Sequence, residues 1–595
     1  MEKQNRSFVK LCYQLYPVYF ILGYLIATLS GVMMPVMVKV YSRFIDQAIA
    51  SVGDKEVVKG LICSFVVLAL MKLYEYFSWF LTYRVKNQFS LRFAEKFTQS
   101  VLEKVSRLEY QKIEDSEVLA LIHRVKRGIE TVDSNISYTM EMLCNIVGII
   151  GLIFLLVKLG ILNIVLLFMV MAAVIFLCYL CANNHYRYVF DYSETDRKVD
   201  YIETLLTTKE IIPEAKVYHS LNFFQSIYIK NMDKSTEIWN SQIKKTRPVE
   251  EFLVPFIGDI FLITIYLMFL VPLYKEQFTI GFYLAILSSS LTITYFIVRE
   301  LPMKAKSLFV FRKYVNDYIS LMNLVDIPHK EEINPLEKIE TIEFEDVYYK
   351  YPKTNEYVLK GLSFKLQAGN HYALIGENGA GKTTIIKLMM GLYKVTKGKI
   401  KINGLDISKF STPQLSQAFS VVFQNFSRYN ITVKEFVMLD SDTEFDQQRA
   451  DEIAKNLQLY STIHNMKYGY NSMLGKSWEE GTDLSGGQWQ KMAIFRMLYH
   501  NKSVQILDEP TAALDPVSES NLYRLYENTS KMNIITLFIS HRLASTKFVD
   551  DILLIKDGIV KERGLHSELM ELRGEYYKMF EAQKQWYLRE EVNYE

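Results

Sequence analysis

The stretch Gly376-Glu377-Asn378-Gly379-Ala380-Gly381-Lys382-Thr383-Thr384 decides the fold of the second half of this chain. It follows the pattern G-x-x-x-x-G-K-[ST] between a strand-like run, 372–375, and a helix-like run, 385–392, which is the context of a P-loop. The glycines let backbone N–H groups close around phosphates, and the helix N-terminus adds positive potential. We predict that all nine residues, called the nucleotide cradle below, bind a nucleotide. Lys382 is expected to contact phosphate and Thr383 to bind Mg²⁺.

Length and composition indicate at least two unlike parts. The 595 residues are too many for one hydrophobic core. Long apolar runs dominate up to about residue 300, whereas charged residues and glycine turns beyond about residue 330 are spaced as in a soluble α/β domain. We therefore predict domains at 1–330 and 331–595. The net charge of +2 gives no reason to expect a nucleic-acid partner, and the five cysteines lack metal-like spacing.

Apolar stretches in the first half are long enough to cross a membrane as helices, since about 20 residues span about 30 Å of hydrocarbon. Six of them lie at about residues 16–40, 57–82, 143–159, 161–182, 253–274 and 279–298. Basic residues cluster on one side of this topology, so we expect that side and both termini to face the cytoplasm. The loops on the opposite side are too short for an outer domain, and no signal peptide is evident.

Two long connections on the predicted cytoplasmic side, about 84–140 and 183–250, are charged and helical in period. Turn-prone residues interrupt them in the segments 110–123 and 212–224. Each interruption either forms a short transverse helix that contacts another domain or is an ordinary helical hairpin tip.

Acidic residues within or beside the predicted spans are candidates for substrate binding, because ionisable residues in a membrane are costly and are often functional. They are Glu75, Glu141 and Asp259. If all three face a common interior, they form a negative ring suited to a cationic substrate. The alternatives are pairing of Glu75 with Lys72 one turn away and simple exposure of Glu141 at the membrane interface.

Further residues of the second half suit nucleotide chemistry. Tyr351, on an upstream loop, is placed to stack on a purine, and Gln424 ends a strand-like run where it can reach a metal or the attacking water. Asp508 and Glu509 end another strand. We expect Asp508 to hold Mg²⁺ through water and Glu509 to orient and deprotonate the attacking water. His541 follows a further strand, where its imidazole can contact the γ-phosphate.

A second anion site is predicted at the signature segment, Leu484-Ser485-Gly486-Gly487-Gln488, which opens the helix-like run 489–498. A serine and two glycines at a helix N-terminus direct a hydroxyl and N–H groups outward. The signature segment could contact the phosphate bound by Lys382 of the same chain only if the backbone made a large excursion. We therefore expect it to complete a site on another copy of the domain, which implies a dimer.

Together these motifs resemble the ATP-binding cassette family. Their order carries the resemblance: Tyr351, the nucleotide cradle, Gln424, the signature segment, Asp508-Glu509, Ala513-Leu514-Asp515 and His541. Six membrane helices followed by one cassette are similar to exporter half-transporters, so the resemblance covers essentially the whole chain. It implies two halves with ATP between the cradle of one and the signature of the other, with Asp515 at the nucleotide and the transverse helices as coupling helices.

The expected fold class is therefore multidomain, with an all-α transmembrane domain of six helices followed by an α/β P-loop cassette. The resemblance further implies that hydrolysis of ATP resets an alternating-access cycle. Both halves of the nucleotide site are intact in sequence, so we expect a homodimer. A heterodimer whose partner carries a degenerate site is the alternative.

The segment before the signature departs from the pattern of many exporters, which carry a T-x-V-G-E-R-G-like sequence. Here residues 474–483 read L-G-K-S-W-E-E-G-T-D. This form is similar to bacterial exporters of lantibiotics and other ribosomal peptides, so we expect an amphipathic, cationic peptide as substrate and a bacterial plasma membrane as location. Multidrug or lipid export, an ATP-gated channel and a regulatory subunit are the alternatives. Some peptide exporters carry an N-terminal cysteine-protease domain that removes the leader of the substrate. Here the first span begins near residue 16, which leaves no room for such a domain, so leader cleavage is expected to need another protein.

Overall fold

The computed structural model describes residues 16–51, 58–156, 172, 176–177, 195, 197–208, 211–327, 336, 338–439, 444–510, 518–523, 533–540 and 543–591. Two compact units divide the chain. The first contains Met1–Arg107 and Ile113–Leu324, and the second contains Leu108–Lys112 and Val325–Glu595.

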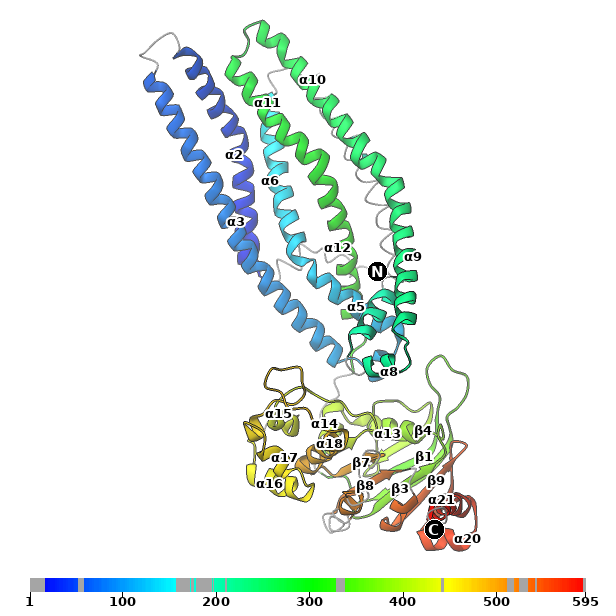
Figure 1. Ribbon diagram of the computed structural model, residues 1–595. Coiled ribbons are helices and arrows are strands. Elements are labelled where there is room, and N and C mark those ends of the chain that lie inside the picture. The colour runs from blue at the N-terminus through cyan, green and yellow to red at the C-terminus, as the bar shows by residue number, and fades with distance from the viewer. Residues whose placement is uncertain are drawn as a thin grey trace. The chain divides into compact units, whose positions relative to one another are not determined.

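Long helices make up the first unit (Figure 1). Their bounds are α2 (Pro17–Ala50), α3 (Val58–Ser106), α5 (Ser116–Glu130), α6 (Val132–Leu156), α8 (Ile212–Val217), α9 (Leu221–Arg247), α10 (Val254–Tyr274), α11 (Ile280–Tyr295) and α12 (Leu301–Met322). Two π-helical segments, η3 (Pro248–Leu253) and η4 (Phe296–Glu300), join α9 to α10 and α11 to α12. In the sequence, the short helix α4 (Tyr110–Ile113) follows α3 and precedes α5, and all but its last residue belong to the second unit.

Within the described residues, five helical stretches are long and apolar enough to cross a membrane. They are Pro17–Ala50, Val58–Ser106, Val132–Phe154, Glu251–Tyr274 and Ile280–Met322. These correspond to the predicted spans except the one at 161–182, of which only residues 172, 176 and 177 are described. Many of their apolar side chains are exposed, as expected of surfaces that face lipid.

Both interrupted connections contain the turns that their sequences indicated. Asp115 caps α5 by accepting a hydrogen bond from the Glu117 N–H at 2.9 Å, which separates α5 from α4. Pro213 occupies the first turn of α8, where its missing N–H has no helical partner to lose. Each connection therefore bends through a short helix, α4 or α8.

The second unit is built on two sheets. A four-stranded antiparallel sheet has the order β2-β1-β4-β5, and a six-stranded sheet has the order β10-β9-β3-β8-β7-β6. The strands are β1 (Thr341–Tyr349), β2 (Leu359–Gln367), β3 (His371–Gly376), β4 (Lys397–Ile402), β5 (Leu405–Asp406), β6 (Phe419–Val422), β7 (Val504–Asp508), β8 (Ile535–Ile539), β9 (Asp551–Lys556) and β10 (Ile559–Gly564). In the larger sheet all neighbouring pairs are parallel except β9 and β10.

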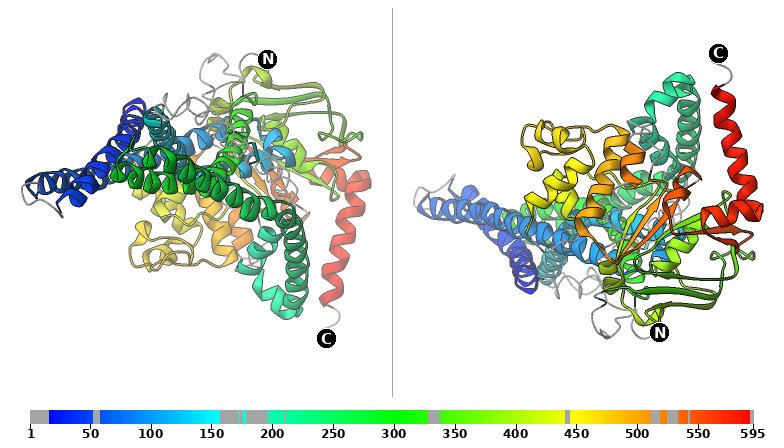
Figure 2. Two further views of the ribbon diagram at one scale, coloured as in Figure 1. Left: turned by 90° about the horizontal axis from the view of Figure 1, so that it is seen from above. Right: turned by 90° about the horizontal axis from the view of Figure 1, so that it is seen from below.

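Helices cover the sheets of the second unit on different sides (Figure 2). They are α13 (Lys382–Met389), α14 (Thr412–Ala418), α15 (Val433–Met438), α16 (Gln447–Asn456), α17 (Tyr460–His464), α18 (Gly486–His500), α20 (His566–Leu572) and α21 (Glu575–Glu591). The central strands β3, β7 and β8 are buried along their whole length, as expected of parallel strands with both faces covered. Their carboxyl ends lie at one edge of the sheet, where ligands bind in open α/β folds.

Candidate nucleotide site and membrane cavity

The nucleotide cradle joins the end of β3 to the start of α13. Gly379 and Gly381 have φ angles of +83° and +98°, which side chains with a Cβ rarely adopt. The Lys382 side chain is 7% exposed, and its ammonium group donates to the carbonyls of Gly376 at 2.6 Å and Glu377 at 2.9 Å. Burial lowers the pKa of Lys382, while the charges of Glu509 and Asp508 oppose this shift. The loop therefore folds around a buried cation.

Tyr351 is tied to the helix that follows the cradle. Its hydroxyl lies 2.9 Å from the Thr384 hydroxyl, and its ring packs edge-on against Tyr349 and Tyr393. Thr384 is buried, whereas the neighbouring Thr383 is exposed. The structure thus places Tyr351 beside the cradle and leaves Thr383 accessible to a ligand.

β7 ends at the acidic residue Asp508, and a second acidic residue, Glu509, follows it directly. Asp508 is 5% exposed, and burial, followed by the nearby charge of Glu509, raises its pKa to about 6. Glu509 has a φ of +49°, a left-handed conformation that is uncommon for residues other than glycine. Its carboxylate accepts a hydrogen bond from the Gln424 side chain at 2.7 Å. The structure therefore brings together Gln424 and Glu509, which the sequence had assigned to the same reaction.

The signature segment opens α18, as its sequence indicated. Ser485 is the N-cap, its hydroxyl accepts from the Gln488 N–H at 3.2 Å, and the Gln488 side chain accepts from the Ser485 N–H at 2.9 Å. This capping box fixes the N-terminus of the helix. His541 and Asp515, both assigned to the nucleotide site from the sequence, lie outside the described residues.

Gln490 belongs to the same constellation, although the sequence analysis gave it no role. Its side-chain amide donates to the Glu509 carbonyl at 3.2 Å, and the residue is 4% exposed. Nothing in the sequence links a position in α18 with a backbone carbonyl beyond β7. The available signal was a glutamine that the helical period places on the same face as Ala493, Ile494 and Met497.

The unusual segment 474–483 is a closed loop. Its ends meet where the Gly475 N–H donates to the Thr482 carbonyl at 2.9 Å. The Trp478 ring N–H donates to the Asn430 carbonyl at 2.9 Å, and the Asn430 side chain donates to the Ser477 hydroxyl at 2.8 Å. Trp478 as a whole residue remains 53% exposed.

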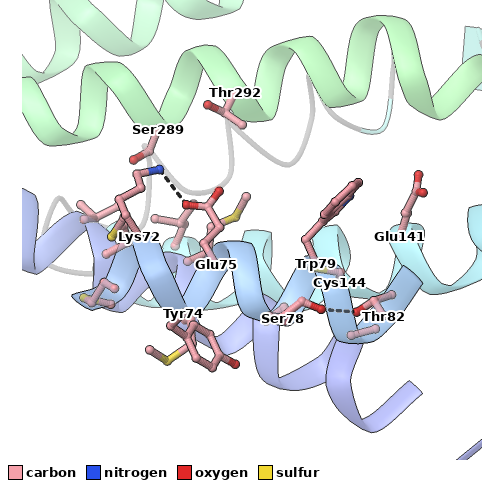
Figure 3. Close-up of a pocket in the computed structure, with 18 of the residues that line it drawn as sticks. Lys72, Tyr74, Glu75, Ser78, Trp79, Thr82, Glu141, Cys144, Ser289 and Thr292 are labelled. Atoms are coloured by element: carbon pink, nitrogen blue, oxygen red, sulfur yellow. Dashed lines mark hydrogen bonds and ion pairs between the residues drawn. The ribbon is translucent and has the colours of Figure 1, made fainter. Parts of the chain in front are cut away.

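In the first unit, α2, α3, α6 and α11 line a cavity of about 620 Å³. Figure 3 shows Lys72, Glu75 and Trp79 of α3 directed toward the space below Ser289 and Thr292 of α11. Methionines contribute much of the apolar wall, namely Met33, Met34, Met37, Met71 and Met140. Thioether side chains adapt to ligands of varied shape.

The three acidic residues predicted to bind substrate do not share one site within the single chain. Glu75 and Glu141 line the cavity, but Asp259 of α10 is exposed elsewhere. The Glu75 carboxylate lies 2.7 Å from the Lys72 ammonium group, as the alternative interpretation of Glu75 proposed. Glu141 lies 2.8 Å from the ammonium group of Lys304, whose side chain is only 5% exposed. Each cavity acid therefore has a lysine partner.

Comparisons with known proteins agree with this geometry. The ABC transporter family profile matches residues 359–512. The subtilin transport ATP-binding protein SpaT of Bacillus subtilis is 26% identical over 84% of this chain and 81% of its own length. The nisin transport ATP-binding protein NisT of Lactococcus lactis is 35% identical over 40% of each chain. The ATP-dependent lipid A-core flippase of Escherichia coli K12 is 33% identical over 41% of each chain.

A solved structure of a bacterial Atm1-family ABC exporter with ATP bound has the same fold. It aligns with a TM-score of 0.79 and 20% identity, covering 95% of this chain and 98% of that one. The alignment spans both units, so the predicted combination of a helical transmembrane domain and an α/β nucleotide-binding domain is confirmed. This chain therefore belongs to the ATP-binding cassette exporters, as a multi-pass half-transporter whose ATPase is coupled to transport.

Proposed function

We propose that this half-transporter exports an amphipathic, cationic peptide of the lantibiotic kind across a bacterial plasma membrane. The observation that carries the proposal is the cavity, which combines two carboxylates, each paired with a lysine, with a flexible methionine wall and the Trp79 ring. An amphipathic cation suits such a lining, because its apolar face and its charges each find a matching surface. The likeness to the subtilin transporter, which covers most of both chains, supports the same substrate class.

The nucleotide chemistry follows from the residues at the carboxyl edge of the larger sheet. Lys382 and the N–H groups of the cradle would hold the phosphates of ATP. Thr383, Gln424 and Asp508 offer oxygen atoms, the ligand type that Mg²⁺ prefers, and bound Mg²⁺ would neutralise phosphate charge. Glu509 would orient and deprotonate the attacking water.

A half-transporter implies a partner, and an identical copy is the simplest one. In that homodimer the signature segment of one chain completes the nucleotide site of the other. His541 and Asp515 would contribute to the same composite site, and α4 and α8 would act as the coupling helices. Val217, Tyr218 and Phe223, in and after α8, have exposed apolar side chains, which suits a surface that a second copy covers. Both termini and the cassette would lie in the cytoplasm.

The test is ATPase and transport in proteoliposomes with nisin as the cationic peptide. Nisin is expected to stimulate the wild-type ATPase and to accumulate inside inside-out vesicles. Glu509→Gln should lower ATP hydrolysis by about 100-fold or more, because general base catalysis is lost while the fold is kept. ATP binding should persist. Continued nisin accumulation by Glu509→Gln would contradict an ATP-driven pump and favour a channel.

Lipid export is a second candidate, because the lipid A flippases match this chain as well as the nisin transporter does over a similar length. A labelled phospholipid in the same proteoliposomes distinguishes the two. ATP-dependent movement of the lipid, together with no response to nisin, would replace the peptide proposal with a flippase.

A further inference from the structure

Glu509 is held in its left-handed backbone conformation from three directions. Its N–H donates to the Ile539 carbonyl at 2.9 Å, and its carboxylate accepts from Gln424. Its own carbonyl accepts from the side-chain amide of Gln490 at 3.2 Å. A left-handed φ costs a glutamate conformational energy, which these contacts offset. The third contact is therefore part of what positions the carboxylate.

Gln490 lies in α18, the helix that the signature segment opens, whereas Glu509 follows β7. Gln490 is little more than one turn after Ser485, and α18 is packed against the core by Trp489, Met492 and Ala493, all almost fully buried. A packed helix moves as a rigid body, so a displacement of its N-terminus displaces Gln490 as well. The Gln490 amide thus connects the signature segment with the carbonyl of Glu509.

We propose that Gln490 couples the two nucleotide sites of the dimer. This inference rests on the proposed function, in which the signature of one chain contacts the nucleotide held by the partner's cradle. Glu509 of that same chain serves its own nucleotide. Docking of the signature on the partner's nucleotide fixes α18, and Gln490 then holds Glu509 in the conformation that hydrolyses ATP. Gln490 is a positioning residue, since it acts on the reaction through Glu509.

The first experiment separates binding from turnover in the homodimer. Gln490→Met keeps side-chain length and removes the donor, so kcat for ATP should fall by about tenfold, the effect of one hydrogen bond to a buried acceptor. The KM for ATP should stay within about twofold, because Gln490 is not assigned a contact with nucleotide. Lys491→Gln is the matched control on the same helix, where the ammonium group contacts Gln458 instead, at 3.2 Å. It should leave kcat unchanged.

The second experiment uses mixed dimers, purified through two different affinity tags. Gln490→Met and Glu509→Gln are placed either on the same chain or on opposite chains, and the first hydrolysis of ATP is measured in a single turnover. If Gln490 acts through Glu509 of its own chain, Gln490→Met should not change the rate of the first hydrolysis when it lies on the same chain as Glu509→Gln. On the opposite chain it should slow the remaining active site by about tenfold.

The outcomes are distinct. A slow rate with the substitutions on opposite chains, and a normal rate with both on one chain, supports the coupling. The reverse pattern would mean that Gln490 only maintains the signature surface for the partner, and it overturns the inference, as do equal rates in the two arrangements. A wild-type pair that forms no dimer with ATPase activity overturns the proposed function and this inference together.

Discussion

Single residues in the first unit show how charge is accommodated in a segment suited to a membrane. The Lys304 ammonium group lies 2.8 Å from Glu141 and 2.5 Å from Glu300, and it sits 5.4 Å from the centre of the Phe296 ring. A charge with so little exposure persists only when it is paired. Lys304 therefore joins α6 to the segment around η4, besides neutralising an acid of the cavity.

Replacing Lys304 should reveal this role as a loss of stability. Lys304→Met leaves two carboxylates without their cation, but both are at least partly exposed, so we expect a cost of roughly 1 to 2 kcal/mol. Thermal unfolding in detergent measures it. Lys72→Met is the matched control, because the Lys72–Glu75 pair is exposed on one helix and should contribute only a few tenths of a kcal/mol. Equal shifts in the two variants would contradict the assignment.

His566 gives the second unit a pH dependence. Its Nδ1 lies 2.7 Å from the Tyr576 hydroxyl, which in turn lies 2.7 Å from the Thr546 hydroxyl. Burial, followed by the positive charge of Lys547, lowers the pKa of His566 below its usual value of 6.5. The unfolded chain therefore binds more protons just below pH 6.5, and the stabilisation from His566 is lost as the pH falls through that range.

The check is the unfolding midpoint of wild type and His566→Gln between pH 7.5 and 5.5. The wild-type midpoint should fall more steeply over this range than that of the variant. Comparison with the variant is needed because the raised pKa of Asp508 acts in the opposite sense, stabilising the fold as the pH falls toward its pKa. If the unfolding midpoints of wild type and His566→Gln changed equally with pH, His566 would not be the cause of the pH dependence.

At the level of elements, Asp46 ties the end of α2 to the start of α11. Its carboxylate accepts from the Thr279 hydroxyl at 2.6 Å and from the Gly281 N–H at 2.8 Å. A negative charge at a helix N-terminus is favourable, and here it also satisfies an N–H that has no partner within the helix. A Cβ on Gly281 would lie 2.3 Å from the Ser42 carbonyl oxygen, so the two elements approach as closely as backbone allows.

Asp46→Ala should therefore loosen the start of α11. We expect a loss of about 1 to 2 kcal/mol in unfolding free energy and faster amide exchange at Gly281 and Phe282. Asp46→Asn keeps an oxygen acceptor and should lose less than half of that. If both variants exchange at the wild-type rate, the contact does not stabilise the helix.

At the scale of the whole molecule, the cavity charges are balanced within one chain. Glu75 and Glu141 each have a lysine partner, so removing both acids would leave Lys72 without its carboxylate and Lys304 with Glu300 alone, which makes the cavity less favourable for a cationic peptide. The double variant Glu75→Gln with Glu141→Gln should raise the nisin concentration for half-maximal ATPase stimulation by about tenfold. Basal ATPase should be unchanged.

Asp259→Asn tests whether Asp259 belongs with Glu75 and Glu141 to the predicted ring of negative charges. Asp259 does not line the cavity of the single chain, so this substitution alone should leave the nisin response near wild type. A loss as large as that of the double variant would show that Asp259 meets the peptide in the dimer, and a double variant with an unchanged nisin response would rule the two cavity acids out.

The sequence predicted most of the architecture because its strongest signals are local. Apolar runs such as 253–274 indicate membrane helices from hydrophobicity alone, and the cradle requires only the strand, the glycines and the helix that adjoin it. Asp508 and Glu509 were identified because they end a buried strand. In each case the relevant neighbours are within a few residues.

Contacts between distant residues needed the tertiary structure. Asp46 meets Gly281 across 235 positions, and no local pattern distinguishes it from any acid at the end of a span. The sequence also could not tell that Asp259 and Glu75 lie on different surfaces, since the rotation of a helix about its axis depends on its packing.

The sequence by itself therefore determined that this chain has a membrane unit followed by an α/β unit of the ABC transporter family, and it predicted which residues bind the nucleotide. The tertiary structure alone decided which charges are neutralised and what holds the segment after β7. Gln490 and the left-handed Glu509 show the reason, because a side-chain donor and a backbone carbonyl meet only after α18 packs beside β7. Sequence records which groups exist, whereas packing sets the distances at which hydrogen bonds and ion pairs act.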